Sequence, residues 1–182
     1  RGRGRAPPPS RAFLGTGGTD MSAARRTIAI EKLDAQFKFE VAKKPGGANI
    51  RKCYACGTCT AGCPVFQVES EYNPRKLIRM ILLGMRREVL SSKVIWLCAR
   101  CAVCSANCPQ DVDFSNIMMA LRDMAVEEGF APADMQERID RIGTAAHELR
   151  RDCINLLLGM GEASESDARA SAERALAEAM KK

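Results

Sequence analysis

Two cysteine runs decide the fold of this chain: C-Y-A-C-G-T-C-T-A-G-C-P at residues 53–64 and C-A-R-C-A-V-C-S-A-N-C-P at residues 98–109. Both follow the pattern C-x2-C-x2-C-x3-C-P, which is typical of cysteines that bind cubane [4Fe–4S] clusters. Together the runs contain all but one of the 9 cysteines. This pattern predicts two clusters and favours an electron carrier.

The spacing of each run has a physical reason. A cubane has four iron corners, and each corner binds one soft thiolate. Two-residue gaps let a tight loop reach three corners, whereas the three-residue gap and the proline turn the fourth cysteine toward the other cluster. We therefore predict that Cys53, Cys56, Cys59 and Cys108 hold the first cluster. The ligands predicted for the second cluster are Cys98, Cys101, Cys104 and Cys63.

Two other uses of cysteine fit the runs less well. Tetrahedral zinc also binds paired C-x2-C motifs, but it needs only four ligands, and each run here carries a third step and a Cys-Pro. Disulfides would suit a secreted chain, and these evenly stepped cysteines with very short gaps suit a cluster better than crosslinks.

Composition limits the rest of the chain. With 182 residues and only 5% aromatic residues, we expect one domain with a modest apolar core that its clusters help to stabilise. No apolar run approaches the roughly 20 residues of a membrane span. We therefore expect no transmembrane segment and, from the reduced thiols, a cytoplasmic protein.

The net charge is +6, and basic residues concentrate before the first cysteine run. Residues 1–20 are rich in Arg, Gly and Pro, a composition that predicts disorder. The pair Arg25-Arg26 is not followed by the apolar stretch of an export signal. We predict a flexible basic extension at residues 1–33, a cluster-binding domain at 34–161 and a helix-prone tail at 162–182.

The first predicted helix follows Asp34 and places Phe37 and Val41 on one face, although residues 37–41 also alternate like a strand.

The strongest helical pattern lies between the runs. It begins at Asn73 and Pro74, which suit an N-cap and a first helical position. Its apolar positions are Leu77, Ile78, Ile81, Met85 and Val89. Its basic flank, either a solvated face or a docking surface for an acidic partner, is Arg75, Lys76, Arg79, Arg86 and Arg87.

Further helices follow the second run. Asp113 is the predicted N-cap of a helix from Phe114 to about Glu128 that Gly129 ends. We expect a third helix near Pro132 and a fourth near Thr144. Cys153 lies in the apolar stripe of the fourth helix, so we predict a buried side chain rather than a ligand.

Several catalytic motifs are missing from the sequence. It has no Cys-Cys-Gly, the motif of disulfide-reducing cluster subunits, and no G-x-G-x-x-G of a dinucleotide site. We therefore predict no catalytic residue in this chain and a need for partners at both ends of an electron relay.

The segments C-Y-A-C-G-T-C-T-A-G-C-P-V at 53–65, N-P-R-K-L-I-R-M at 73–80 and I-W-L-C at 95–98 resemble the iron–sulfur C subunit of soluble heterodisulfide reductase. This resemblance, over about residues 34–160, implies an all-α fold, an α-helical ferredoxin domain around two [4Fe–4S] clusters. A βαββαβ ferredoxin is the alternative, but the segment between the runs has a helical pattern.

The resemblance also implies partners. These are a flavin subunit that carries FAD, a subunit with Cys-Cys-Gly motifs, and hydrogenase or formate dehydrogenase modules. The role implied is electron relay from the flavin subunit to the disulfide-reducing subunit.

Two other functions stay open at this point. The chain could be the iron–sulfur subunit of a flavin-linked 2-hydroxyacid or glycerol-3-phosphate dehydrogenase, which often joins the same two runs to Cys-Cys-Gly domains. It could also be a cluster-based sensor that binds nucleic acid through its basic start, but that segment lacks interleaved aromatic residues.

Overall fold

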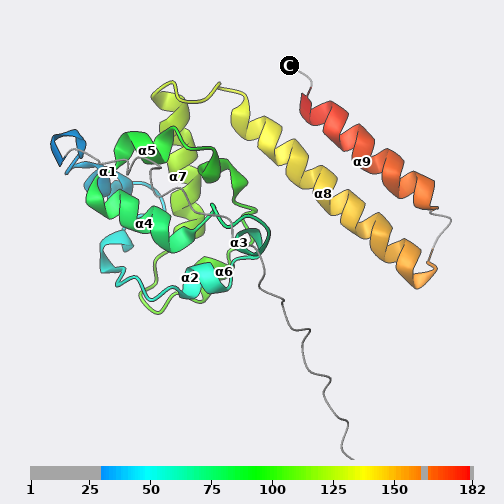
Figure 1. Ribbon diagram of the computed structural model, residues 1–182, viewed down its shortest axis with the longest axis horizontal. Coiled ribbons are helices and arrows are strands. Elements are labelled where there is room, and N and C mark those ends of the chain that lie inside the picture. Colours follow the sequence, from blue (N-terminus) through cyan, green and yellow to red (C-terminus); the bar gives the residue numbers. More distant parts are fainter. Residues whose placement is uncertain (1–29, 161–163, 181–182) are drawn as a thin grey trace, which may run out of the picture.

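The computed structural model describes residues 30–160 and 164–180, and within these ranges every regular element is helical (Figure 1). The prediction of an all-α fold is therefore confirmed. The predicted disorder of residues 1–20 lies outside the described residues. The shorter elements are η1 (Ile30–Lys32), η2 (Ile50–Lys52), α2 (Thr58–Ala61), α3 (Pro64–Val68), α5 (Arg86–Leu90), η3 (Lys93–Leu97) and α6 (Val103–Ala106). The longer ones are α1 (Phe37–Lys43), α4 (Pro74–Leu83), α7 (Phe114–Glu127), α8 (Met135–Leu158) and α9 (Glu165–Met180).

An apolar core forms where α1, α4, α5 and α7 meet. Its side chains are nearly fully buried and come mainly from the helical stripes predicted on either side of the cysteine runs. The short helices α2 and α6 contact each other at one end of this core (Figure 1). The core thus holds the two cysteine loops side by side. Its main members are Phe37, Val41, Ile50, Leu77, Ile78, Ile81, Val89, Leu90, Ile95, Phe114, Ile117, Met118, Leu121 and Met124.

The helix between the runs begins as predicted and ends earlier than its apolar pattern suggests. The Asn73 side chain accepts a hydrogen bond from the backbone of Lys76, and Pro74 opens α4. Gly84 then ends α4 in the left-handed conformation at φ 82°, and α5 follows as a separate helix. A Cβ on Gly84 would overlap the carbonyl group of Asp34. The approach of the segment before α1 therefore requires a glycine here.

Helix α1 confirms the helical alternative for residues 37–41, and Phe37 and Val41 face the core. Asp34 accepts a hydrogen bond from the backbone N–H of Gln36 just before the helix. Arg86 donates to Asp34 at 2.9 Å, to Glu40 at 2.7 Å and to Glu128 at 2.7 Å. Arg86, predicted in the basic flank, therefore ties α1, α5 and the end of α7 together and is not free for docking.

The C-terminal region differs from its prediction. Residues 135–158 form the single helix α8, where we expected two helices beginning near Pro132 and Thr144. Thr144 donates its hydroxyl proton to the carbonyl of Asp140 within this helix, so it does not start a new one. Gly159 ends α8 in the left-handed conformation, at φ 62°. Cys153 is exposed, which corrects the prediction of a buried side chain.

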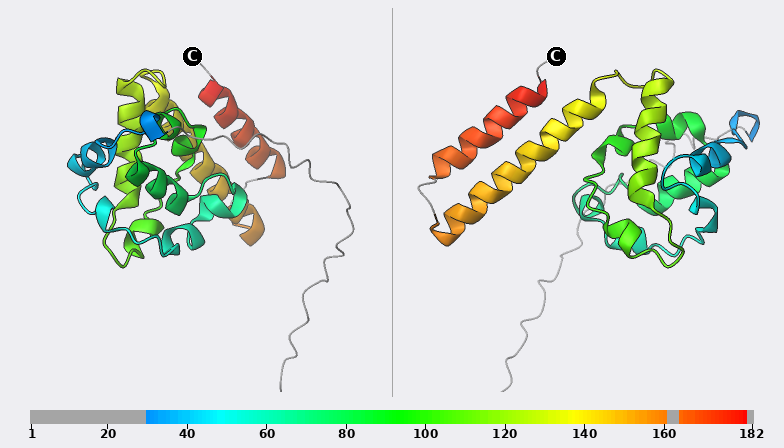
Figure 2. Two further views of the ribbon diagram at one scale, coloured as in Figure 1. Left: turned by 60° about the vertical axis from the view of Figure 1, so that its left-hand side comes forward. Right: turned by 180° about the vertical axis from the view of Figure 1, so that it is seen from behind.

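Helices α8 and α9 form an antiparallel hairpin that projects from the cluster-binding core (Figures 1 and 2). Each packs chiefly against the other, and no residue of α8 is buried. Within the two described ranges, no helix has both the length and the apolar content that crossing a bilayer requires.

Candidate cluster-binding site

The two cysteine loops repeat the same backbone conformation. Each contains two left-handed residues at matching places, Ala55 and Gly57 in the first loop and Arg100 and Ala102 in the second. The second left-handed residue of each loop precedes a four-residue helix, α2 or α6, that carries the third cysteine of the run. The equal spacing of the two runs therefore corresponds to an equal fold of the two loops.

A hydroxyl group anchors each loop to the helix that follows it. Thr60, directly after Cys59, donates to the Asn73 side chain at 3.0 Å and accepts from the backbone N–H of Arg75 at 3.0 Å. Both partners belong to the start of α4. This contact orients the first cysteine loop against the core.

In the second loop, a hydroxyl group makes the equivalent hydrogen bonds to the start of α7. Ser105, directly after Cys104, donates to Asp113 at 2.7 Å and accepts from the backbone N–H of Ser115 at 3.1 Å. Asp113 is the N-cap residue of α7, as predicted, but its carboxylate makes no capping hydrogen bond with the backbone of this helix. It accepts instead from side chains around the second loop.

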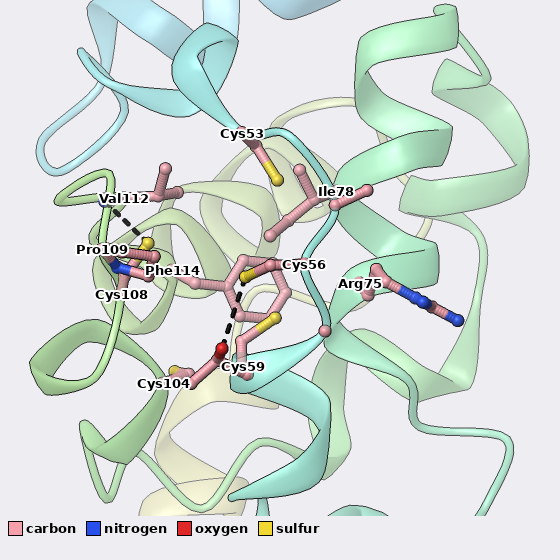
Figure 3. A pocket seen from close by; sticks show the side chains of 13 residues that line it. Cys53, Cys56, Cys59, Arg75, Ile78, Cys104, Cys108, Pro109, Val112 and Phe114 are labelled. Atoms are coloured by element: carbon pink, nitrogen blue, oxygen red, sulfur yellow. Dashed lines mark hydrogen bonds between the residues drawn. The ribbon is translucent and has the colours of Figure 1, made fainter.

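Cysteines from both runs line one pocket (Figure 3). Cys53, Cys56 and Cys59 come from the first loop, while Cys108 and Cys104 come from the second. The rest of the lining is mainly apolar. Among the residues that the structure describes, Arg75 is the only charged side chain in this lining, and it points away from the thiols in Figure 3. The other contributors are Ala55, Gly57, Thr58, Ile78, Pro109, Val112 and Phe114.

A second group of thiols surrounds Tyr72, which is 2% exposed. Burial raises the pKa of the Tyr72 hydroxyl, and the thiolate charges of Cys98, Cys63 and Cys104 raise it further. Cys63, from the first run, and Cys98 and Cys104, from the second, therefore all lie close enough to Tyr72 to act on its hydroxyl. Cys101, the remaining predicted member of this group, is exposed.

The thiols differ in how readily they lose their protons. The hydroxyl and backbone of Thr58 lower the pKa of Cys56, whereas burial raises the pKa of Cys59. Burial, helped by the charge of Cys98, raises the pKa of Cys104 to about 11. A metal that binds Cys59 and Cys104 would therefore have to displace protons that these thiols hold more tightly than a free cysteine does.

The donor set fits an iron–sulfur cluster. Thiolates are soft ligands, and the first pocket offers several of them among apolar walls with no carboxylate in its lining. Within the described ranges, no three His, Cys, Asp or Glu side chains converge closely enough to hold one metal ion. Cubane ligands bind four separate corners and need not converge on one point. The backbone N–H of Val112 donates to the Cys108 sulfur at 3.3 Å, a contact of the kind that tunes cluster potentials.

The sequence reasoning missed two residues beside the second loop, Tyr72 and Arg122. Arg122 is only 1% exposed, although it lies in α7 among apolar neighbours. The sequence does carry a signal for Arg122. It is a charged residue directly after Leu121, inside a helix whose other buried positions are apolar. The ring of Trp96, two residues before Cys98, lies beside Arg122, whose guanidinium carbon is 5.7 Å from the ring centre.

Comparison with known proteins gives consistent matches over this region. Residues 52–113 match the family model of a 4Fe-4S dicluster domain. The chain is 42% identical over 81 residues to the second iron-sulfur C subunit of the CoB–CoM heterodisulfide reductase of Methanocaldococcus jannaschii, covering 44% of this chain and 42% of that protein. It is 34% identical over 102 residues to the C subunit of the H2:CoB-CoM heterodisulfide,ferredoxin reductase of Methanothermobacter thermautotrophicus, covering 56% of this chain and 54% of that protein.

A third relative, from Archaeoglobus profundus, is a protein named as like the heterodisulfide reductase C subunit. It is 34% identical over 106 residues, which are 58% of this chain and 54% of that protein. The chain spans about half the length of the curated relatives it matches. Residues 52–113 thus match a 4Fe-4S dicluster domain, and the resemblance of the chain to the C-subunit family of heterodisulfide reductase is confirmed.

Proposed function

We propose that this chain is the electron-transfer subunit of a heterodisulfide reductase-like complex and that it holds two [4Fe–4S] clusters. The observation that carries the proposal is the pocket in which Cys108, from the second run, lies with Cys53, Cys56 and Cys59 from the first. A fold that brings the fourth cysteine of one run to the first three of the other suits crossed ligation.

In this proposal Cys53, Cys56, Cys59 and Cys108 hold one cluster, and Cys98, Cys101, Cys104 and Cys63 hold the other. Cys104 also lines the first pocket, so it would stand between the two sites. The shared wall would keep the two clusters close, as transfer of an electron between them requires.

Each cluster, once bound, supplies one-electron oxidation and reduction without a change of ligands. The chain contributes the surroundings. Ile78, Val112 and Phe114 line the first pocket with apolar groups that limit the access of water. The N–H of Val112 directs a dipole at the Cys108 sulfur. The core helices hold both loops in place, so little rearrangement would accompany a change of charge.

The partners follow from the family resemblance. We propose that a flavin-containing protein with FAD donates electrons to this chain and that a protein with Cys-Cys-Gly motifs accepts them. Hydrogenase or formate dehydrogenase modules would supply the complex with electrons. The names of the relatives support such an assembly, because they describe subunits of heterodisulfide reductases that use H2, formate or ferredoxin. In this proposal residues 34–161 form the relay domain, and no substrate is converted on this chain.

Anaerobic reconstitution of the full chain tests the cofactor content. We expect about eight iron atoms and eight sulfides per chain and electron paramagnetic resonance signals of two [4Fe–4S] clusters after reduction. Mixing with the purified flavin and Cys-Cys-Gly partners should give a complex that reduces a disulfide only when this chain is loaded. A chain that holds zinc, or a complex equally active without the chain, would contradict the proposal.

A further inference from the structure

Arg122 is a buried cation without a carboxylate partner. Its side chain is 1% exposed, and no Asp or Glu oxygen lies within 4.0 Å of it in the described part of the chain. A guanidinium keeps its proton in proteins, so this position carries a full positive charge. Burial of an unpaired charge is strongly unfavourable unless another group compensates for it.

Three hydrogen bonds of Arg122 go to the backbone that leads into the second cysteine loop, and its Nη1 contacts the Met119 sulfur at 3.9 Å. Nε donates to the carbonyl of Ile95 at 2.9 Å, while Nη2 donates to the carbonyls of Trp96 at 3.2 Å and Cys98 at 2.9 Å. Nη1 reaches the Gln136 side chain at 3.5 Å. These partners are dipoles, and none of them supplies a negative charge. Arg122 therefore fixes the backbone that leads into Cys98, but its charge is left to be balanced by something else.

The thiolates of the second loop are the charges best placed to balance it. Cys98 is in direct contact with Arg122 through its carbonyl. The other charged groups that act on Arg122, Arg100 and Asp140, form a pair with each other at 3.9 Å and are more than half exposed. Four thiolates around a [4Fe–4S] core carry net negative charge, which grows when the core accepts an electron.

The first pocket has no comparable group. Its only charged lining residue, Arg75, is exposed and points outward (Figure 3). An exposed charge is screened by water and salt, whereas a buried one acts through a medium of lower dielectric constant. The two sites therefore differ in the buried positive charge beside them.

We propose that Arg122 is a positioning and tuning residue for the cluster that Cys98 helps to hold, and that its buried charge raises the reduction potential of this cluster above that of the Cys53 cluster. The inference rests on the proposed function. The added electron needs no proton, because the buried guanidinium already supplies the compensating positive charge. At equilibrium a single electron in the chain would then reside mainly at the Cys98 site.

Potentiometric titration followed by electron paramagnetic resonance tests this proposal on the reconstituted full chain. Arg122→Gln should lower the midpoint potential of one cluster and leave the other unchanged. Arg122→Lys keeps the charge and should restore most of the lost potential. Arg75→Gln is the matched control and should move neither midpoint measurably. A Cys101→Ser variant identifies the signal of the Cys98 cluster, because it changes a ligand of that cluster alone.

A second measurement needs no variant at Arg122. Since a buried charge is poorly screened, the separation of the two midpoints in the unaltered chain should persist at high salt. Three outcomes would overturn this inference and leave the proposed function standing. They are two intact clusters with equal midpoint potentials, a separation of the midpoints that collapses in salt, and an Arg122→Gln protein with unchanged midpoints. An unaltered chain that does not take up two [4Fe–4S] clusters would overturn the proposed function as well.

Discussion

The two cysteine loops share their spacing, their left-handed residues and their hydroxyl anchors, and they differ in what surrounds them. The first loop faces an apolar pocket whose one charged residue, Arg75, is exposed. The second loop lies against the buried Tyr72 and Arg122. One ligand pattern is thus placed in two electrostatic environments. A chain with two unlike sites can give an electron a preferred position, which two equal sites cannot.

Removal of one fourth cysteine should have the largest effect and tests whether the loops share their ligands. We expect Cys108→Ala to lose about half of the iron, with the loss at the Cys53 cluster, because its fourth ligand would come from the other run. Iron analysis and resonance spectra would show this. Cys153→Ala is the control and should keep all its iron, since Cys153 is exposed and far from either run in sequence. Loss at the Cys98 cluster instead would disprove the crossed assignment.

The second largest effect is expected from removing the hydroxyl groups of Thr60 and Ser105, which anchor the two loops. Thr60→Ala should destabilise the protein by about 1–3 kcal/mol, because the Asn73 side chain would lose one of its two hydrogen bonds and the N–H of Arg75 would lose its partner in a partly buried place. Ser105→Ala should have a smaller effect, since Ser105 is less buried than Thr60. Anaerobic urea unfolding measures both.

The conservative exchanges Thr60→Ser and Ser105→Thr keep the hydroxyl groups and serve as controls. They should stay within about 1 kcal/mol of the unaltered chain. Equal loss in Thr60→Ala and Thr60→Ser would show that the methyl group matters more than the hydrogen bonds.

The left-handed residues offer a subtler comparison. Gly57 has φ 90°, and an added Cβ would find ordinary contact distance to Arg75 at 3.6 Å. Gly57→Ala should therefore cost about 1–2 kcal/mol through backbone strain alone. At the matching position, Ala102→Gly relieves strain but increases the entropy of the unfolded chain, so we expect a change below about 1 kcal/mol. Thermal melts of both variants would show whether the loops are strained alike.

The smallest expected effect is a difference in acid sensitivity between the anchors. Burial alone would raise the pKa of Asp113, but hydrogen bonds from Ser105, Asn116 and Ser115 outweigh it and hold the pKa below its ordinary value. A carboxylate with a depressed folded pKa stabilises the protein above its unfolded pKa, and this stability is lost as the pH falls through the folded value. The first anchor uses the amide of Asn73 and has no such dependence.

Urea unfolding at pH 7 and near pH 3 would measure this difference. Asp113→Asn should reduce the loss of stability between the two pH values, since the amide does not titrate. An Asp113→Asn protein with the same acid sensitivity as the unaltered chain would show that other groups cause it.

Local sequence patterns were sufficient to predict where several helices begin and end. The Asn73-Pro74 start of α4, the stripe of α7 and the stop at Gly129 depend on neighbours within a few residues, and the structure has them as predicted. The break at Gly84 depends on the approach of Asp34 from 50 residues earlier. Two helices were predicted for residues 132–160 because Pro132 and Thr144 resemble start signals, but Thr144 is accommodated inside α8.

The sequence by itself determined the chemistry of the site, because cluster ligation depends on cysteine spacing within runs of 12 residues. It also determined the helical class of the fold through periodic apolar positions. Only the tertiary structure decided that Tyr72 and Arg122 lie buried beside the second cysteine loop. Those contacts join segments distant in sequence, and their energies depend on burial and charge, which no local pattern encodes.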